Sequence, residues 1–145
     1  MDYSKLSGDQ INQTIAKLVG WKVEYEPEGD DEERYLPAAW VLNDNNGDLA
    51  EIVFVDLEAP YEEGEEAAWK LAPKFATDLN EAISLVGELT FQLTHSKLSD
   101  TWSADIIDGA NVAKAFAKTP ARAICESWLI WKEKLAKAAE EGVLQ

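Results

Sequence analysis

The sequence predicts an α+β protein with a single domain over residues 1–145. The expected architecture is a three-layer α/β/α sandwich, with a mainly antiparallel sheet and helices on both faces. Two observations carry this prediction. Apolar residues recur with helical spacing from Thr119 to Glu141, and two apolar strands flank Asn46-Gly47, a strong hairpin signal. Both faces of that hairpin are apolar, so helices should cover it on both sides.

The N-terminal part predicts a helix followed by a strand and an acidic loop. Ser7 and Gln10 form a capping-box pattern, and Gly20 ends the helix. Apolar and charged residues then alternate from Trp21 to Tyr25, which favours a short strand. The segment Glu26 to Arg34 is rich in carboxylates and is predicted to be a mobile, exposed loop.

The next part holds the hairpin and the least informative stretch of the chain. A two-residue turn at Asn46-Gly47 pairs Trp40 with Val53. The same register pairs Val41 with Ile52. The segment Leu57 to Ala76 holds two prolines and a glutamate cluster, and we expect a long loop with one helical turn near Ala67 to Leu71.

The C-terminal half predicts two helices around a set of strands. Thr77 or Asp78 caps the first helix, which ends at Gly87. Thr119 caps the last helix, and Pro120 suits its first turn. Strands are predicted over Leu89–Thr94 and Trp102–Ile106. The alanines of Val112–Lys118 favour a helix, but its short length and alternation favour an edge strand, which we expect.

The net charge of −15 comes from 28 acidic and 13 basic residues, and it disfavours binding to nucleic acid or to an anionic membrane. There is no apolar run long enough to cross a membrane and no signal-peptide pattern, so we expect a cytoplasmic protein. The single Cys125 fits a reducing compartment and a place in the core. Three uses of the acidic surface stay open: solubility, binding of a basic partner, or imitation of nucleic-acid charge.

The sequence predicts no catalytic centre, no metal site and no cofactor. Asp44, Asn46 and Asp48 have the first spacings of a calcium loop but lack its later glycine and glutamate, so the hairpin turn explains them better. His95 is the only histidine, and no nucleophile-elbow or phosphate-binding glycine motif is present. A carboxylate-based site stays open because 28 acidic residues offer many combinations.

Three stretches resemble one known family. They are Met1-Asp2-Tyr3-Ser4-Lys5-Leu6-Ser7 with Ile11-Asn12, Thr77-Asp78-Leu79-Asn80-Glu81-Ala82, and Thr119-Pro120-Ala121-Arg122-Ala123-Ile124-Cys125. They are similar to the phage ABA-sandwich domain family of small tailed-phage accessory proteins, with the related NinX-like proteins. The resemblance implies the fold and a phage origin, and it brings no catalytic residues. The chain departs from the family in its acidic loop and over residues 57–76.

The resemblance implies an accessory protein that acts inside the infected bacterial cell, and it leads to three hypotheses. In the first, a host-directed, anti-defence protein binds a basic host protein, with possible DNA mimicry, through Asp30, Asp31, Glu32, Glu33, Tyr61 and Trp69. In the second, the fold sequesters a small defence-signalling nucleotide, within or between protomers, through Lys114, Lys118 and Arg122. The third is a small phage enzyme with a carboxylate-based site. The first hypothesis is favoured, because a phosphate ligand needs local Lys or Arg and the chain is strongly acidic.

Overall fold

The structure, a computed structural model, describes residues 1–31, 34–55 and 61–141. Its internal contacts divide the chain into a terminal unit, residues 1–11 and 74–145, and a central unit, residues 12–73. Helix α1 (Gly8–Leu18) runs from the first into the second. The predicted α+β class is confirmed, but the strands form two three-stranded sheets and a two-stranded ribbon instead of one sheet. The three-layer sandwich stays a prediction.

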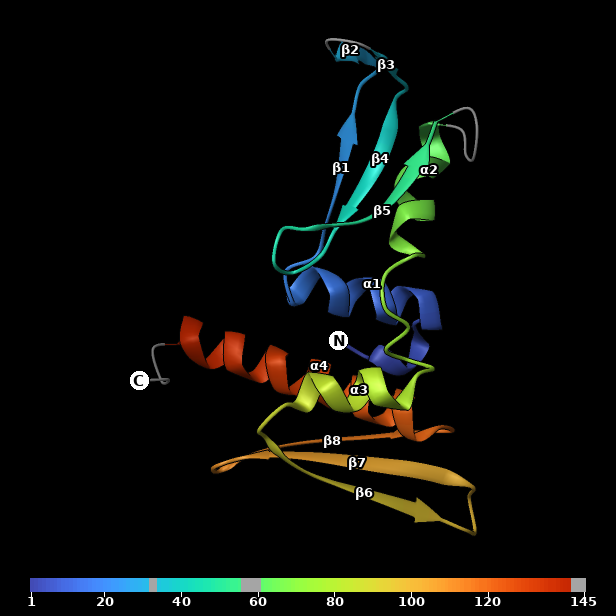
Figure 1. The fold of residues 1–145 in the computed structure, drawn as a ribbon. Coiled ribbons are helices and arrows are strands. Elements are labelled where there is room, and N and C mark those ends of the chain that lie inside the picture. The colour runs from blue at the N-terminus through green and yellow to red at the C-terminus, as the bar shows by residue number, and fades with distance from the viewer. Residues whose placement is uncertain (32–33, 56–60, 142–145) are drawn as a thin grey trace. The chain divides into compact units, whose positions relative to one another are not determined.

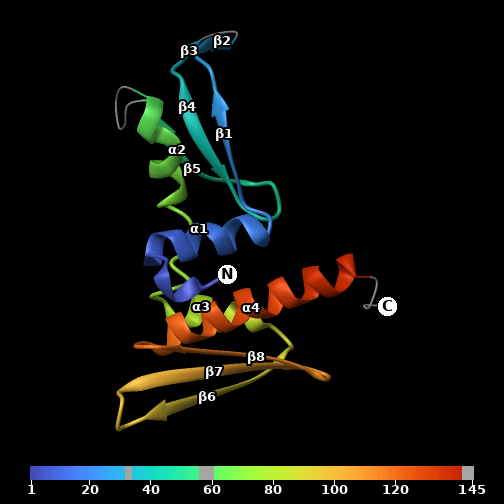
Figure 2. The same cartoon turned by 180° about the vertical axis from the view of Figure 1, so that it is seen from behind.

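The terminal unit combines a three-stranded antiparallel sheet, in the order β6-β7-β8, with helices on one side. Helix α4 lies along β7 and β8, and α3 packs beside α4 on the same side of the sheet (Figures 1 and 2). The predicted edge strand is therefore confirmed as β8. The elements are η1 (Tyr3–Lys5), α3 (Leu79–Val86), β6 (Thr90–Ser96), β7 (Thr101–Asp108), β8 (Asn111–Ala117) and α4 (Pro120–Glu140).

Helix α4 begins and packs as its sequence predicts. The Thr119 hydroxyl accepts a hydrogen bond of 3.3 Å from the backbone N–H of Arg122, which confirms the cap. The apolar stripe is buried as far as Leu129, with Trp128 only 3% exposed, whereas Trp131 and Leu135 are half-buried and Ala136 is exposed. Three of the four buried sheet positions on this side are alanines, which let the helix approach closely, and the fourth is an isoleucine. The buried residues of these two strands are Ala104, Ile106, Ala113 and Ala115.

Two side chains of α4 also hydrogen-bond to the backbone of β8. The buried Ser127 hydroxyl donates to the carbonyl of Ala113 at 2.7 Å. The Lys134 ammonium donates to the carbonyl of Val112 at 2.7 Å. Helix and strand are therefore joined by polar contacts as well as by apolar packing.

The central unit holds a three-stranded antiparallel sheet in the order β1-β4-β5. The predicted pairs Trp40 with Val53 and Val41 with Ile52 are confirmed. Helix α2 packs on β1, β4 and β5 (Figures 1 and 2). The elements are β1 (Lys22–Glu26), β2 (Gly29–Asp31), β3 (Arg34–Leu36), β4 (Ala39–Asn43), β5 (Leu49–Phe54) and α2 (Tyr61–Trp69).

The hairpin turn is longer than its sequence predicts. The register shifts after Leu42, and residues 44–48 form the connection. The Asp44 carboxylate accepts from the backbone N–H groups of Asn46 at 2.9 Å and Asp48 at 3.0 Å. This side-chain turn, together with the positive φ of Gly47, replaces the expected two-residue turn.

Two loop predictions are wrong over the described residues. Part of Glu26 to Arg34 is strand, because β2 pairs with β3 and places Asp31 opposite Arg34. The prediction of strands relied on alternating apolar residues, and this segment has none. Its strands form through backbone pairing alone, which the sequence pattern does not reveal. The segment predicted as a loop from Leu57 to Ala76 contains α2, whose glutamates and alanines are good helix formers. Residues 56–60 lie outside the described residues.

Helix α2 covers the face of the central sheet that carries Tyr25, Trp40 and Val53. Val53 is 4% exposed, in keeping with burial beneath this helix. On the opposite face, Ile52 remains 37% exposed. Ala39 and Val41 of that face are buried, so the predicted cover on both sides of the hairpin is incomplete at Ile52.

Gly64 explains how α2 comes so close to the sheet. A Cβ atom at this position would lie 3.2 Å from Cγ of Trp40 and nearer still to Cδ1 and Nε1 of the same ring. Glycine inside a helix costs about 1 kcal/mol relative to alanine. That cost is offset by direct contact between the helix backbone and the indole ring.

We expect Gly64→Ala to destabilise the protein by about 1–3 kcal/mol, because the added methyl group displaces Trp40. In the background of Trp40→Leu, the same change should be neutral or stabilising, as in an ordinary helix. Urea unfolding of the four proteins measures the coupling between the two sites. Equal effects of Gly64→Ala in both backgrounds would contradict the contact.

Tyr3 connects η1 to the side of α4. Its hydroxyl donates to Oε2 of Glu133 at 3.1 Å. Burial, and then the hydrogen bond and charge of Glu133, raise the pKa of Tyr3 to about 12 from the ordinary 10.0. The neutral phenol is thus favoured in the folded protein.

The raised pKa predicts alkaline destabilisation. The contribution of Tyr3 to stability should be complete below pH 10.0, its ordinary pKa, and should be lost as the pH rises through about 12. Absorbance titration of phenolate, compared between the parent and Tyr3→Phe, isolates this group. Ionisation of Tyr3 in the folded protein near its ordinary pKa would refute the prediction.

Candidate functional site

The acidic charge is concentrated in the central unit. Residues 12–73 include 16 acidic and four basic residues, a net charge of −12, whereas the terminal unit has 12 acidic and nine basic residues, a net charge of −3. The predicted contacts Asp30 and Asp31 belong to β2, while Glu32 and Glu33 lie outside the described residues. The exposed carboxylates described in this unit are Glu24, Glu26, Glu28, Asp48, Glu51, Glu63, Glu65 and Glu66.

Three aromatic rings of the central unit form a cluster beside these carboxylates. The ring centroids of Tyr25, Trp40 and Tyr61 lie 5.1–5.6 Å apart in all three pairs. Tyr61 is 51% exposed and Tyr25 is 39% exposed. The sequence identified Tyr61 but missed Tyr25, whose place is set by its pairing opposite Trp40 in the sheet.

Trp69, which the sequence proposed as a second aromatic contact, is a core residue. It is the last residue of α2 and only 6% exposed. The Lys17 ammonium lies 5.2 Å from the centroid of its ring. The prediction that Trp69 contacts a partner is therefore corrected, because so buried a side chain offers little surface for binding.

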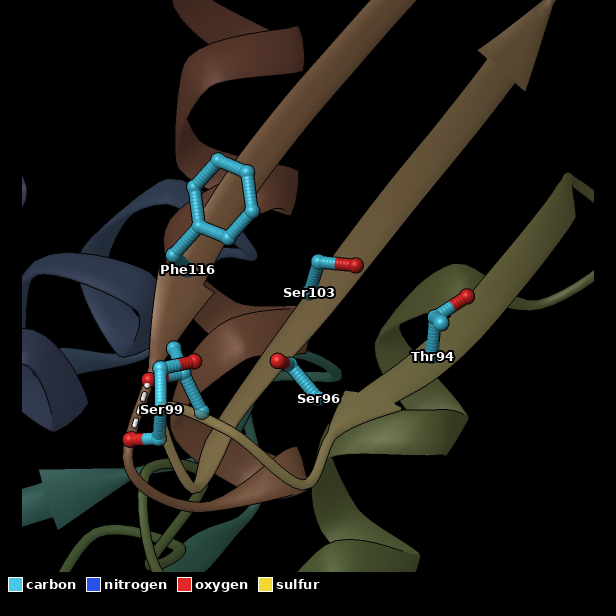
Figure 3. A pocket seen from close by; sticks show the side chains of 6 residues that line it. Thr94, Ser96, Ser99, Ser103 and Phe116 are labelled. Atoms are coloured by element: carbon cyan, nitrogen blue, oxygen red, sulfur yellow. Dashed lines mark hydrogen bonds between the residues drawn. The ribbon is translucent and has the colours of Figure 1, made fainter.

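The terminal unit carries a hollow on the face of its sheet that is turned away from α3 and α4. Its volume is about 370 Å³, and Figure 3 shows side chains from β6, β7 and β8 around it. Phe116, 60% exposed, stands at the β8 side of the hollow. The lining residues are Thr94, Ser96, Ser99, Thr101, Ser103 and Phe116.

Two of the three predicted ligand-binding cations border this hollow. The Lys118 ammonium donates to the carbonyl of Ser99, a lining residue, at 3.2 Å. The Lys114 ammonium lies 5.7 Å from the ring centroid of Phe116 and 3.6 Å from the carboxylate of Asp105. The sequence missed the hydroxyl groups and Phe116. Strand alternation could have indicated them, because residues that alternate with the buried alanines of β7 and β8 lie on the opposite face of the sheet.

Arg122, the third predicted cation, lies elsewhere and has structural partners. Its Nε donates to Glu126 at 2.8 Å, and Nη2 donates to the backbone carbonyls of Tyr3 and Leu6. The side chains of Arg122 and Glu126 are 19% and 7% exposed. Arg122 therefore ties the first residues to α4, which corrects its grouping with Lys114 and Lys118.

Other reactive groups have identified surroundings. Cys125 is fully buried, and burial raises the pKa of its thiol to about 12. His95 contacts the Asp100 carboxylate at 3.0 Å and the ring of Trp102. Among the residues that the structure describes, no group of three or more His, Cys, Asp or Glu is placed to hold a metal ion. None of the described helices has both the length and the apolarity needed to cross a membrane.

We expect Arg122→Gln to lower the free energy of unfolding by about 3 kcal/mol, because it leaves the buried Glu126 without its charged partner. Arg122→Gln combined with Glu126→Gln should recover part of this loss. Chemical denaturation measures both changes. A single variant as stable as the parent would contradict the structural role of Arg122.

Comparison with solved structures relates this fold to a phage protein. The chain is similar to a phage protein from Bacillus cereus ATCC 14579, with a TM-score of 0.52 and 15% sequence identity. The match covers 90% of this chain and 96% of the other. No protein-family model matches the sequence, and no curated protein does. The structural likeness shows a shared fold.

Proposed function

We propose that this protein is a phage-encoded accessory protein that binds a basic host protein in the cytoplasm of the infected cell, without catalysing a reaction. Blunting a host defence, with carboxylates in place of nucleic-acid phosphates, is the form of activity that we favour. The fold of the Bacillus cereus phage protein supports the phage origin. The three stretches that resemble the phage ABA-sandwich family point the same way.

The main support for binding through the central unit is its net charge of −12 within residues 12–73, together with its exposed tyrosines. Dense like charge destabilises a folded unit by self-repulsion and is compensated when a basic surface docks. Tyrosine is common among the residues that contribute most to interfaces. Tyr61 and Tyr25 therefore provide apolar anchoring within an acidic surface.

Neutralising part of this surface should weaken binding. Glu63→Gln, Glu65→Gln and Glu66→Gln, combined in one variant, remove three exposed charges from α2 with little change in helix propensity. We expect slower association with the captured partner and a smaller effect on dissociation, measured by surface plasmon resonance. Glu88→Gln, Glu140→Gln and Glu141→Gln make the same charge change in the terminal unit and should leave binding unchanged.

The partner is first isolated by capture from bacterial lysate and identified by mass spectrometry. Its affinity should fall steeply with salt, because exposed charges are screened within about 8 Å at physiological ionic strength. Tyr61→Ala should also weaken binding, whereas Leu98→Ala, at a fully exposed position of the terminal unit, should not. The proposal fails if no basic protein is captured, or if binding is insensitive to both salt and the triple variant.

A further inference from the structure

The hollow on the sheet of the terminal unit is lined by hydroxyl groups and one phenylalanine, without a carboxylate, although the protein as a whole is acidic. Two lysine ammonium groups border it, one at Ser99 and one above Phe116. Its floor and walls carry hydroxyl groups from strands β6 and β7 (Figure 3). Hydroxyl and ammonium groups are the usual donors to phosphate oxygens.

The lining hydroxyl groups differ in whether they already donate a hydrogen bond within the protein. Thr101 donates to the carbonyl of Ser99 at 3.1 Å, drawn as the dashed line in Figure 3. With the bond from Lys118 to the same carbonyl, this contact holds the turn at one end of the hollow. Thr94, Ser96 and Ser103 line the remaining part of the hollow, with the Ser96 hydroxyl directed toward β7 and the Ser103 hydroxyl toward β6 (Figure 3).

Phe116 adds an apolar surface to this polar site. The ring is 60% exposed, although apolar residues on the other face of β8 are buried. An exposed aromatic ring is a platform on which a planar base can stack. The volume of about 370 Å³ lies at the small end of the range for ligand sites, roughly 300–1,000 Å³.

We propose that this hollow binds a nucleoside monophosphate. The base stacks on Phe116, and the phosphate accepts hydrogen bonds from Ser and Thr hydroxyls with Lys118, at the Ser99 end of the hollow, as its counter-charge. Lys114, on the opposite side of Phe116 along β8, adds a longer-range attraction. Asp105, which pairs with Lys114 at 3.6 Å, moderates the positive charge, so a single phosphate suits the site better than a polyphosphate. The site belongs to the terminal unit, whereas the acidic surface proposed to bind a protein belongs to the central unit.

The test is an NMR titration of the full chain with the adenosine, guanosine, cytidine and uridine 5′-monophosphates at low ionic strength. Because the hollow is open, we expect a Kd between about 0.1 and 1 mM for at least one of them. Amide shifts should change at Thr94, Ser103 and Phe116. No shift at these residues with about 10 mM of any of the four nucleotides would overturn the proposal.

Variants separate the stacking contribution from the charge contribution. Phe116→Ala should weaken binding at least fivefold by loss of stacking, whereas Phe116→Tyr should retain it. Lys118→Gln and Lys114→Gln should each weaken it by about two- to fivefold. Lys137→Gln, the same charge change on α4, should have no effect.

The uncharged nucleoside tests the phosphate directly. The nucleoside of the best-bound nucleotide should bind more weakly than the nucleotide itself, because the two lysines have no anion to contact. Equal affinity of the two, or equal affinity of Phe116→Ala and the parent, would overturn the assignment. Because Phe116, Lys114 and Lys118 are exposed, these variants are expected to fold, which circular dichroism verifies.

Discussion

The close packing of α4 on β7 and β8 is the constraint on which the terminal unit depends. Ile124, Cys125, Trp128 and Leu129 of the helix are buried, and three of the four buried positions on this side of β7 and β8 are alanines. Strand geometry then fixes the other face, since successive side chains point to opposite sides. The hydroxyl-rich outer face, with Phe116 and Lys114, thus follows from the register that places the alanines under α4.

Local sequence signals predicted the terminal unit well because each one acts within a few residues. The caps at Ser7, Asp78 and Thr119 all form the predicted type of side-chain bond. The stripe of α4 and the alternation in β6 and β7 depend only on periodicity. In the central unit, one local signal succeeded in the same way: the hairpin register followed from Asn46-Gly47, although Asp44 changed the turn itself.

The central unit was harder because its structure depends on contacts between distant residues. Helix α2 contains a glycine in its interior, which taken alone argues against a stable helix although its glutamates and alanines favour one. Its glycine makes sense only once Trp40 is placed against it. The candidate sites were hard to predict for the same reason. Tyr25 contacts Tyr61 only because strand pairing places it beside Trp40. Arg122 lies away from Lys114 and Lys118 because it binds the backbone carbonyls of Tyr3 and Leu6.

The two bonds from α4 to β8 have a consequence for association between sheets. Successive carbonyls along a strand point to opposite sides, so one of the acceptors, Val112 or Ala113, lies on the free edge of β8. The side chain that donates to the acceptor on the free edge, Ser127 or Lys134, obstructs the approach of another strand there. Free edges template pairing with other chains, and charged side chains are a common protection against it. The contacts from α4 to β8 therefore protect this edge of the sheet against pairing with a strand of another chain.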